Sequence, residues 1–284
     1  MIVQSTENEK VRIQVRLADL TRLPEIPSIR GTPTILDPAK VKHAISSVLF
    51  AVIKEGSRPE LNGVYLSEIA MCGDGIRLAS SLLGMAQSVT VPSHAIEPLL
   101  SILSGSDLQM TVGDSWVQVR AGTDVLKFSK FRQEFPTVAG ELRNKFLSKK
   151  PAAIFMIKTK LAEAIIHPLS LFSSNAELVG IRHSVLNFDG KTVYVSVQAP
   201  NMGEFENILP TESVLGGPIS FLFSASSFGE ILANYPGDVM EMRVFSETEP
   251  FIVTDSDEDW VVIQGVMGTA ATAAKVEEEE EDDF

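Results

Sequence analysis

Few residue groups in this sequence have the types and spacing that catalysis or metal binding requires. Asp255-Ser-Asp-Glu-Asp259 places four carboxylates within five residues, and such a cluster could hold a cation. A solvated turn between two strands explains the same run of charge, and we favour the turn. The four histidines, at positions 43, 94, 167 and 183, form no pair at metal-ligand spacing. The residues therefore predict no metal and no cofactor.

Enzymatic motifs are missing from the sequence as well. No phosphate-cradling G-x-x-x-x-G-K-[ST] occurs, and GDGIRLASSLLG lacks the glycine spacing of a dinucleotide-binding turn. The single cysteine, Cys72, can form no disulfide within the chain and suits a reducing cytoplasm. Its expected role is that of a small buried hydrophobe. We therefore predict that the protein is not an enzyme and works by binding partners.

Composition and charge narrow the class of partner. The chain has 284 residues, of which 44% are hydrophobic, enough for two ordinary domains or one large one. Its first ten residues are polar, and no apolar run approaches the roughly 18 residues of a membrane span, so we expect a soluble cytoplasmic protein. The terminal run EEEEEDDF supplies seven negative charges, leaving −6 of the net −13 for the rest. Contact with DNA would therefore need a local basic surface.

The elements that position these residues occur twice in the same order. Each copy has a capped amphipathic helix, three or more alternating strands, a second capped helix and three further strands. The phrases RPELNGVYL and ELVGIRHSVL follow the first helix of each copy, with their glycines 117 residues apart. The helix starts at Ser93 and Ser224 are 131 residues apart. We divide the chain into an extension at 1–35, domains at 36–148 and 149–268, and an acidic tail at 269–284.

A repeat of about 120 residues indicates a duplicated domain, because solenoid repeats are only about 20 to 50 residues long. Each copy should contain two helices and roughly eight strands, many of them alternating. This pattern predicts an α+β fold, in which two helices cover one face of an antiparallel sheet in each of two tandem copies.

The ordered motifs resemble a known family. The series R-x-x-L-N-G-V-x-L, a V-x-V-P strand end and F-x-x-x-F-P is similar to the middle domain of the bacterial DNA polymerase III beta subunit, the replicative sliding clamp. The segments GIRHSVLNFDGKTVYVSVQAP, FENILP, FLFSASSFGEIL and VVIQGVM resemble its last domain. The match spans about residues 35–267. It implies the DNA-clamp fold and a six-domain ring that encircles duplex DNA and tethers a polymerase.

The resemblance also implies an assembly and a set of partners. The first domain of the family's three is expected to be missing, so two domains per chain would need three chains to close the ring. We therefore expect a homotrimer, in a phage or mobile-element setting, that binds double-stranded DNA without sequence preference, a DNA polymerase and a clamp loader. The alternative is a clamp-derived adaptor that does not encircle DNA and recruits replication or transcription partners.

In the family the helices line the hole, where basic residues contact phosphate without reading bases. Exposed lysines near helix starts are often merely solvated, and the helix in SASSFGEILANYPG has no basic residue. The positions that the resemblance places near DNA are Lys40, Lys42, His43, Lys54, Arg58, His94, Lys158 and Lys160.

A second implied site is an apolar pocket that accepts a short peptide from polymerases and the clamp loader. The family's D-G-H-R-L-A is replaced here by Leu82-Leu-Gly-Met-Ala86, and its methionine-proline by Ile263-Gln264, so the preferred peptide should differ. An ordinary buried strand explains positions 261–263 equally well. The matched pocket positions are Leu61, Ser81, Gly84, Met85, Pro136, Val261, Val262 and Ile263.

The acidic tail should be disordered, because five or more like charges in a row repel one another. Its terminal aromatic residue resembles the end of single-strand-DNA-binding proteins, which dock on basic partner pockets. Asp282, Asp283 and Phe284 are therefore candidates for partner binding. A tail that only solubilises the protein is the alternative.

Overall fold

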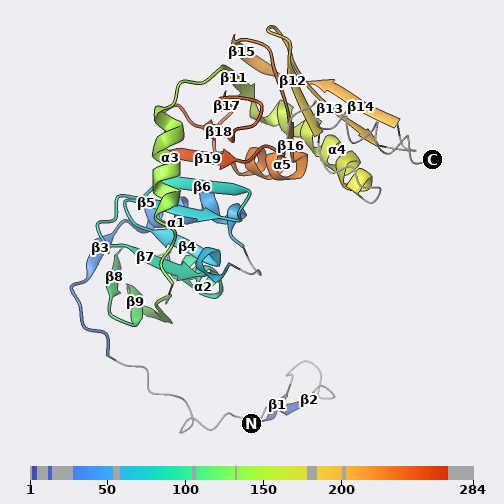
Figure 1. The fold of residues 1–284 in the computed structure, drawn as a ribbon. Coiled ribbons are helices and arrows are strands. Elements are labelled where there is room, and N and C mark those ends of the chain that lie inside the picture. The colour runs from blue at the N-terminus through green and yellow to red at the C-terminus, as the bar shows by residue number, and fades with distance from the viewer. Residues whose placement is uncertain are drawn as a thin grey trace.

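The computed structural model describes residues 2–4, 12–14, 28–53, 58–103, 107–131, 133–177, 184–199 and 203–267 (Figure 1). Near the N-terminus, β1 (Ile2–Gln4) pairs antiparallel with β2 (Arg12–Gln14). The predicted tail contacts at positions 282–284, as well as Lys54 and Gly180, lie outside the described residues.

The first unit runs from β3 to α3. Its helices are α1 (Pro38–Val48), α2 (Ser93–Ile102) and α3 (Val138–Ser148), with short 3-10 turns at Leu49–Ala51 and Pro59–Leu61. Its strands are β3 (Thr34–Leu36), β4 (Gly63–Leu66), β5 (Ile69–Gly73), β6 (Arg77–Leu82), β7 (Val89–Pro92), β8 (Leu108–Val112), β9 (Trp116–Ala121) and β10 (Asp124–Ser129).

The second unit repeats the series with one additional strand. Its helices are α4 (Thr159–Glu177) and α5 (Ala225–Asn234). Its strands are β11 (Ala153–Lys158), β12 (Ser184–Phe188), β13 (Val193–Ala199), β14 (Gly203–Ile208), β15 (Thr211–Gly216), β16 (Ile219–Phe223), β17 (Val239–Val244), β18 (Phe251–Thr254) and β19 (Trp260–Gln264).

Local chemistry sets the starts of α1 and α5 as the sequence predicts, whereas α2 begins at Ser93 after Pro92 and has no side-chain cap. The Asp37 carboxylate accepts from the backbone N–H of Ala39 at 2.9 Å, and Pro38 occupies the first turn. The Ser224 hydroxyl accepts from the N–H of Ser227 at the start of α5. Helix α1 ends at Val48, because the chain tightens into a 3-10 turn at Leu49.

The sheet topology shows the duplication directly. In the first unit the strand orders are β10-β9-β8-β3 and β6-β5-β4-β7. The second unit repeats them as β19-β18-β17-β11 and β14-β13-β12-β16. All the pairings are antiparallel, and β15 adds a strand beside β11. The order of elements thus confirms the predicted α+β fold built from a repeated arrangement.

The two units join through one continuous sheet. Strand β19 of the second unit pairs antiparallel with β6 of the first, which makes a nine-stranded sheet. We call this pairing the β6–β19 junction. One buried apolar cluster continues through both units and includes residues of α1, α2, α4 and α5. Helices α4 and α5 also pack against each other (Figure 1).

Gly63 and α3 are two further local features of the first unit. Gly63 permits a close backbone approach, because a Cβ there would lie 2.3 Å from the carbonyl oxygen of Val91. Helix α3 was not predicted from the sequence. Among the described residues, no helix is long and apolar enough to cross a membrane.

Candidate DNA-binding and partner-binding sites

The cations predicted to contact DNA are only partly gathered by the fold. Lys40, Lys42 and His43 are exposed together in the first turns of α1, and His94 is exposed at the start of α2. Between α1, α2 and α5 lies an open hollow of about 860 Å³ that includes His94, Glu97 and Glu230 in its lining. The helical face therefore mixes basic and acidic side chains.

The two lysines predicted beside α4 have acidic neighbours. Lys160 Nζ lies 3.6 Å from a carboxylate oxygen of Asp238, and both side chains are largely exposed. Lys158 Nζ lies 3.9 Å from Glu212. Exposed pairs at these distances are weak and exchange readily with solvent, so both lysines stay available to other anions. Arg58 is exposed on a different element, with its guanidinium 3.7 Å from the position of a Cβ on Gly75.

A buried arginine anchors the first unit to α5 across the β6–β19 junction. Arg77 Nη1 lies 2.5 Å from a carboxylate oxygen of Glu230, and Nη2 lies 2.7 Å from Asp74. Burial opposes the charged guanidinium, but the hydrogen bonds and charges of Glu230 and Asp74 outweigh it and raise the pKa of Arg77. The guanidinium also lies over the Phe50 ring, with 5.5 Å to its centroid.

Helix α3 lies on the opposite side of the nine-stranded sheet from α1. On β6, Ala79 belongs to the main core with α1, whereas Leu78 packs in the clusters that include α3 residues. Arg143 in α3 donates from Nε to Ser80 Oγ at 3.0 Å and from Nη2 to the carbonyl oxygen of Glu258 at 2.7 Å. These two bonds connect α3 to both units.

The predicted pocket positions do not converge on one hollow. Leu61 and Ile263 pack in the small clusters beneath α3, and Pro136 lies just before that helix. Val261 is buried on the same face of β19 as Ile263. Met85 and Val262 belong to the main core, whereas Gly84 is exposed at a turn with φ +78°. Ser81 lines a hollow beside α1.

That hollow, of about 360 Å³, brings the carboxylate cluster near the basic end of α1. Lys40, His43, Asp255 and Asp259 all line it. Burial, with additional repulsion from Asp259 and Asp257, raises the pKa of Asp255 although its carboxylate accepts from the N–H of Trp260. Within the described residues, no group of three or more metal-binding side chains is placed to hold an ion. The geometry is that of a turn, with Glu258 at φ +60°.

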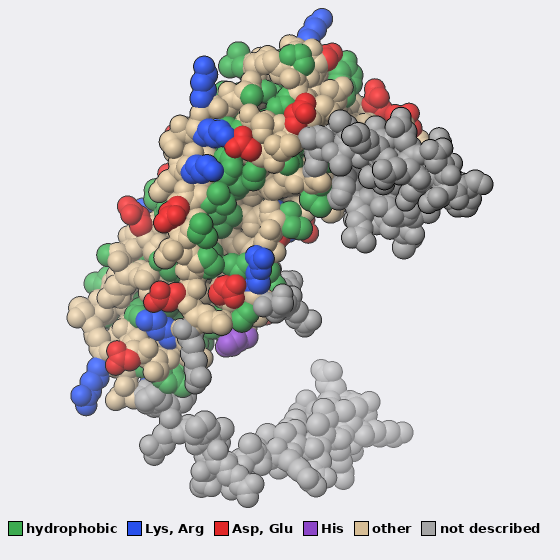
Figure 2. Space-filling model, in the orientation of Figure 1, with side chains coloured by type: hydrophobic (Ala, Val, Ile, Leu, Met, Phe, Trp, Pro, Cys, Tyr) green, Lys and Arg blue, Asp and Glu red, His purple; other side chains and the backbone are tan. Residues whose placement is uncertain are grey.

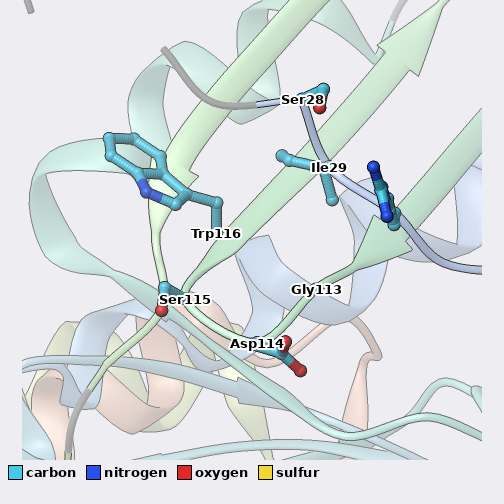
Figure 3. Close-up of a pocket in the computed structure, with 7 residues that line it drawn as sticks. Ser28, Ile29, Gly113, Asp114, Ser115 and Trp116 are labelled. Atoms are coloured by element: carbon cyan, nitrogen blue, oxygen red, sulfur yellow. The ribbon is translucent and has the colours of Figure 1, made fainter. Parts of the chain in front are cut away.

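Another hollow lies between the chain leading to β3 and the turn joining β8 to β9. Ser28 and Ile29 lie on one side of it and Asp114, Ser115 and Trp116 on the other (Figure 3), and Arg30 and Gly113 also line it. Its volume is about 360 Å³. None of these residues was a predicted site residue, and they bring together no set of groups suited to catalysis.

The structural element that sequence reasoning missed is α3. The signal was present, because Phe135, Ala139, Leu142 and Phe146 recur at helical spacing. Only a short segment carries this pattern, and Gly140 interrupts it, so the sequence predicted no helix there.

No protein-family model matches the chain. In sequence it is similar to the beta sliding clamp of Synechocystis sp., at 24% identity over 278 residues, covering 87% of this chain and 68% of the relative.

Solved structures give a closer match in three dimensions. The DNA polymerase III beta chain of Streptococcus pneumoniae superimposes with a TM-score of 0.81 at 18% identity, covering 94% of this chain and 72% of that one. The beta subunit of Thermotoga maritima gives 0.80 at 15% identity, covering 95% and 76%. The protein therefore has the DNA-clamp fold. The matched chains are bacterial DNA polymerase III beta subunits, and the match covers nearly the whole of this chain.

Proposed function

We propose that this protein is a DNA sliding clamp, a ring-forming processivity factor that encircles duplex DNA and tethers a DNA polymerase. The proposal adds a homotrimeric ring, loading by a clamp loader, and a cytoplasmic location in a phage or mobile-element setting. It is supported by the fold, by the similarity to proteins named sliding clamps, and by the arrangement of the sheet edges.

The observation that carries the proposal is that the counterparts of the two paired strands at the β6–β19 junction are edge strands in the described parts of the chain. Within the chain, the last strand of one sheet, β19, pairs with the edge strand β6. The counterparts of these strands are β10 and β14, and each is an edge strand in the described parts of the chain. Because β10 is the counterpart of β19 and β14 of β6, a β10 edge can join the β14 edge of another chain. Such a contact is heterologous and builds a closed ring or a filament.

The internal pairing also predicts the register between chains. Val262 lies opposite Ala79 in the β6–β19 junction. The antiparallel pairings between neighbouring strands, traced in the same order through both units, make Leu126 the counterpart of Val262. They likewise make Phe205 the counterpart of Ala79. Leu126 would then face Phe205, and both are half-buried in the single chain. One step along the strands, Lys127 would face Glu204, a pairing of opposite charges that favours this register.

Three chains with two units each supply the six domains that the resemblance implies. If every junction has the β6–β19 geometry, successive domains are related by the same rotation. The ring closes when the rotations of the six domains add up to a full turn. Within the ring, Lys40, Lys42, His43 and His94 of α1 and α2, with Lys158 and Lys160 beside α4, are the proposed phosphate contacts. Arg58 and Lys54 are proposed beside the DNA. Contacts of this kind permit sliding because they carry no sequence information.

A second candidate is a clamp-derived adaptor that does not encircle DNA. It is favoured by the mixed charge of the helical face, where Glu97 and Glu230 line the same hollow as His94. Helix α5 adds no basic residue. An adaptor of this kind would act through protein contacts, with the tail residues Asp282, Asp283 and Phe284 as candidates.

Mass in solution and retention on DNA separate these candidates. The full chain is measured by light scattering and then loaded onto circular and linear duplex DNA at low salt. A clamp should have the mass of three chains, stay on the circle and run off the linear ends. A monomer that leaves both DNAs equally fast would reject the encircling function and favour the adaptor.

A further inference from the structure

The first strand of each unit has a different environment. In the second unit, β11 is paired on both sides, with β17 along one edge and β15 along the other. In the first unit, its counterpart β3 lies at the margin (Figure 1) and pairs, among the described residues, with β8 alone. The edge of β3 that corresponds to the β15 side of β11 is therefore open. We call this edge, formed by Thr34, Ile35 and Leu36, the β3 slot.

The chain that could fill the slot takes another path. In the second unit β15 lies between β14 and β16, and the corresponding stretch of the first unit, between β6 and β7, is 83–88. This stretch is tied to the turn between β4 and β5. The N–H groups of Leu83 and Gly84 both donate to the carbonyl oxygen of Glu68, at 2.9 and 2.7 Å. Residues 83–88 therefore form no strand beside β3.

The open slot leaves β3 less covered than β11. Counted back from the first residue of the following helix, Thr34 and Leu36 correspond to Phe155 and Ile157. Phe155 and Ile157 are fully buried, whereas Thr34 and Leu36 are only half-buried. On the other face of the strand, Ile35 is 76% exposed. A strand in the slot would remove apolar surface of β3 from water, which is favourable.

Charge gives the slot little protection. Exposed strand edges are normally shielded by short length, by charged side chains or by a covering segment. The strand is short, but its residues Thr-Ile-Leu carry no charge. On the face drawn in Figure 2, the first unit shows hydrophobic side chains among isolated basic and acidic ones rather than a continuous charged patch. A covering segment would complete the protection of this edge.

The chain carries a suitable strand upstream of β3. Residues 11–17 read VRIQVRL, with apolar residues at the odd positions. Within this stretch, β2 pairs with β1 as a separate two-stranded sheet (Figure 1). A two-stranded hairpin is at best marginally stable in water and gains stability by joining a larger sheet. Strands β2 and β3 also have the same length, three residues each.

The linking chain is long enough for β2 to reach the slot. Residues 18–33 separate the two segments, and at roughly 3.3 Å per residue they span up to about 50 Å. The last part of this link already follows β8 and its turn. A Cβ on Gly31 would lie 3.1 Å from Thr111 Cγ2, and one on Gly113 would lie 3.0 Å from Ile29 Cγ2. An antiparallel β2 would then end near the start of β3, as in a wide hairpin.

We propose that residues 11–17 dock in the β3 slot of the same chain as an antiparallel strand, which extends the sheet to β10-β9-β8-β3-β2-β1. The polarity follows from β15, which is antiparallel to β11. The odd, apolar positions would face the core beside Leu36, and the even, polar positions would share the exposed face with Ile35. The inference goes beyond the proposed function, because it needs neither DNA nor a partner protein.

Disulfide trapping in the full chain tests both the face and the chain that supplies the strand. The variant I35C is combined in turn with R12C, Q14C and R16C, and with the controls I13C and V15C. Cys72 is buried and stays in place. Under mild oxidation at least one even-position pair should close to a disulfide within one chain, because opposite residues on one face lie in bonding range. The odd-position pairs should stay reduced, since they point to opposite faces.

Intact mass and non-reducing gels give the result. Disulfides that form only between chains would assign the slot to a neighbouring copy and overturn the proposal. Equal trapping at odd and even positions, or no trapping at any of them, would reject an ordered strand in the slot.

Hydrogen exchange gives a second readout that needs no cysteine. The variant V11S/I13S/V15S weakens the apolar face of the segment, whereas R12S/R16S changes the polar face and is the matched control. Exchange of the β3 amides that face the slot should accelerate at least about tenfold in the first variant and stay unchanged in the control. Amides of β11 should not change in either. Equal exchange of β3 in all three proteins would contradict docking.

The two tests are independent of the clamp proposal. Neither uses DNA or requires a ring, so a failure of the encircling function would appear separately, in the mass of the assembly and in retention on circular DNA.

Discussion

The indole Nε1 of Trp260 donates to the carbonyl oxygen of Ser47 at 3.0 Å, although the two residues belong to different units. Trp260 is the first residue of β19, and Ser47 lies in α1. The bond is buried, and the indole also packs edge-on against Tyr235 at 5.3 Å. The β6–β19 junction is therefore held by a core contact as well as by strand pairing.

This contact should contribute measurably to stability. Trp260→Phe keeps much of the packing but removes the donor, so it should lower the free energy of unfolding by about 1–3 kcal/mol. Trp260→Ala should cost about 3–5 kcal/mol, because it also leaves a cavity. Urea denaturation of both variants checks this order. If Trp260→Phe were as stable as the wild type, the hydrogen bond would have no net value.

The proposed contact between chains should respond to a charge reversal. Lys127→Glu places two carboxylates opposite each other at the β10–β14 edge and should weaken trimer association by roughly tenfold per interface. The double variant K127E/E204K restores opposite charges and should restore the trimer. Analytical ultracentrifugation across a range of protein concentrations measures the trimer association of both variants.

The control for this exchange is Lys130→Glu, which changes an exposed charge just beyond β10. It should leave the trimer intact. A double variant that stays as weak as K127E would show that the two residues do not meet in the predicted register.

The basic end of α1 should govern the salt dependence of DNA binding. Replacing Lys40 and Lys42 by alanine removes two proposed phosphate contacts. The slope of log affinity against log salt should then fall by roughly two, at about 0.9 per contact. The same change at Lys145 and Lys150, at or just beyond α3 on the opposite side of the sheet, should leave the slope unchanged. Fluorescence anisotropy on duplex DNA at several salt concentrations measures both, and equal slopes in all proteins would exclude α1 from the DNA contact.

Asp255 should make stability depend on pH. Burial raises its pKa in the folded protein, so ionisation opposes folding, and stability is lost as the pH rises from the unfolded pKa of aspartate through the higher folded pKa. Asp255→Asn removes the charge and keeps an oxygen acceptor for the Trp260 N–H. The variant should melt at a higher temperature than the wild type at pH 7, and the difference should vanish below the unfolded pKa.

The matched control for that experiment is Asp257→Asn, because Asp257 is an exposed neighbour in the same turn. It should change the melting temperature little at either pH. A lower melting temperature for Asp255→Asn at pH 7 would mean that the carboxylate stabilises the turn more than its burial costs.

Much of the fold could be predicted from the sequence because its signals are local. The Asp37 cap lies two residues from the N–H that it accepts, and the Ser224 hydroxyl lies three residues from its donor. Alternation within single strands and the repeated order of elements gave the α+β class and the duplication. Such patterns depend on neighbours within about one helical turn or one strand, where chain connectivity fixes the distances.

The candidate sites were less predictable because they depend on contacts between distant residues. Lys160 was recognised as a cation, but its neighbour Asp238 comes from another element. The resemblance implied an apolar pocket at Leu61 and Ile263, and in the folded chain these residues pack with Ala139 and Phe146 of α3. The residue types at positions 138–148 do not determine which surface that helix will cover.

The sequence by itself determined the helix caps, the strand periodicity, the duplication and the acidic tail, because each depends on residues close in the chain. Only the tertiary structure decided that β19 joins β6, that Arg77 reaches Glu230 across 153 positions, and that Phe146 of α3 packs against Ile263. Those choices depend on which apolar faces and charges meet after the chain has collapsed. Many alternative pairings satisfy the local pattern equally well, and packing of the whole core selects among them.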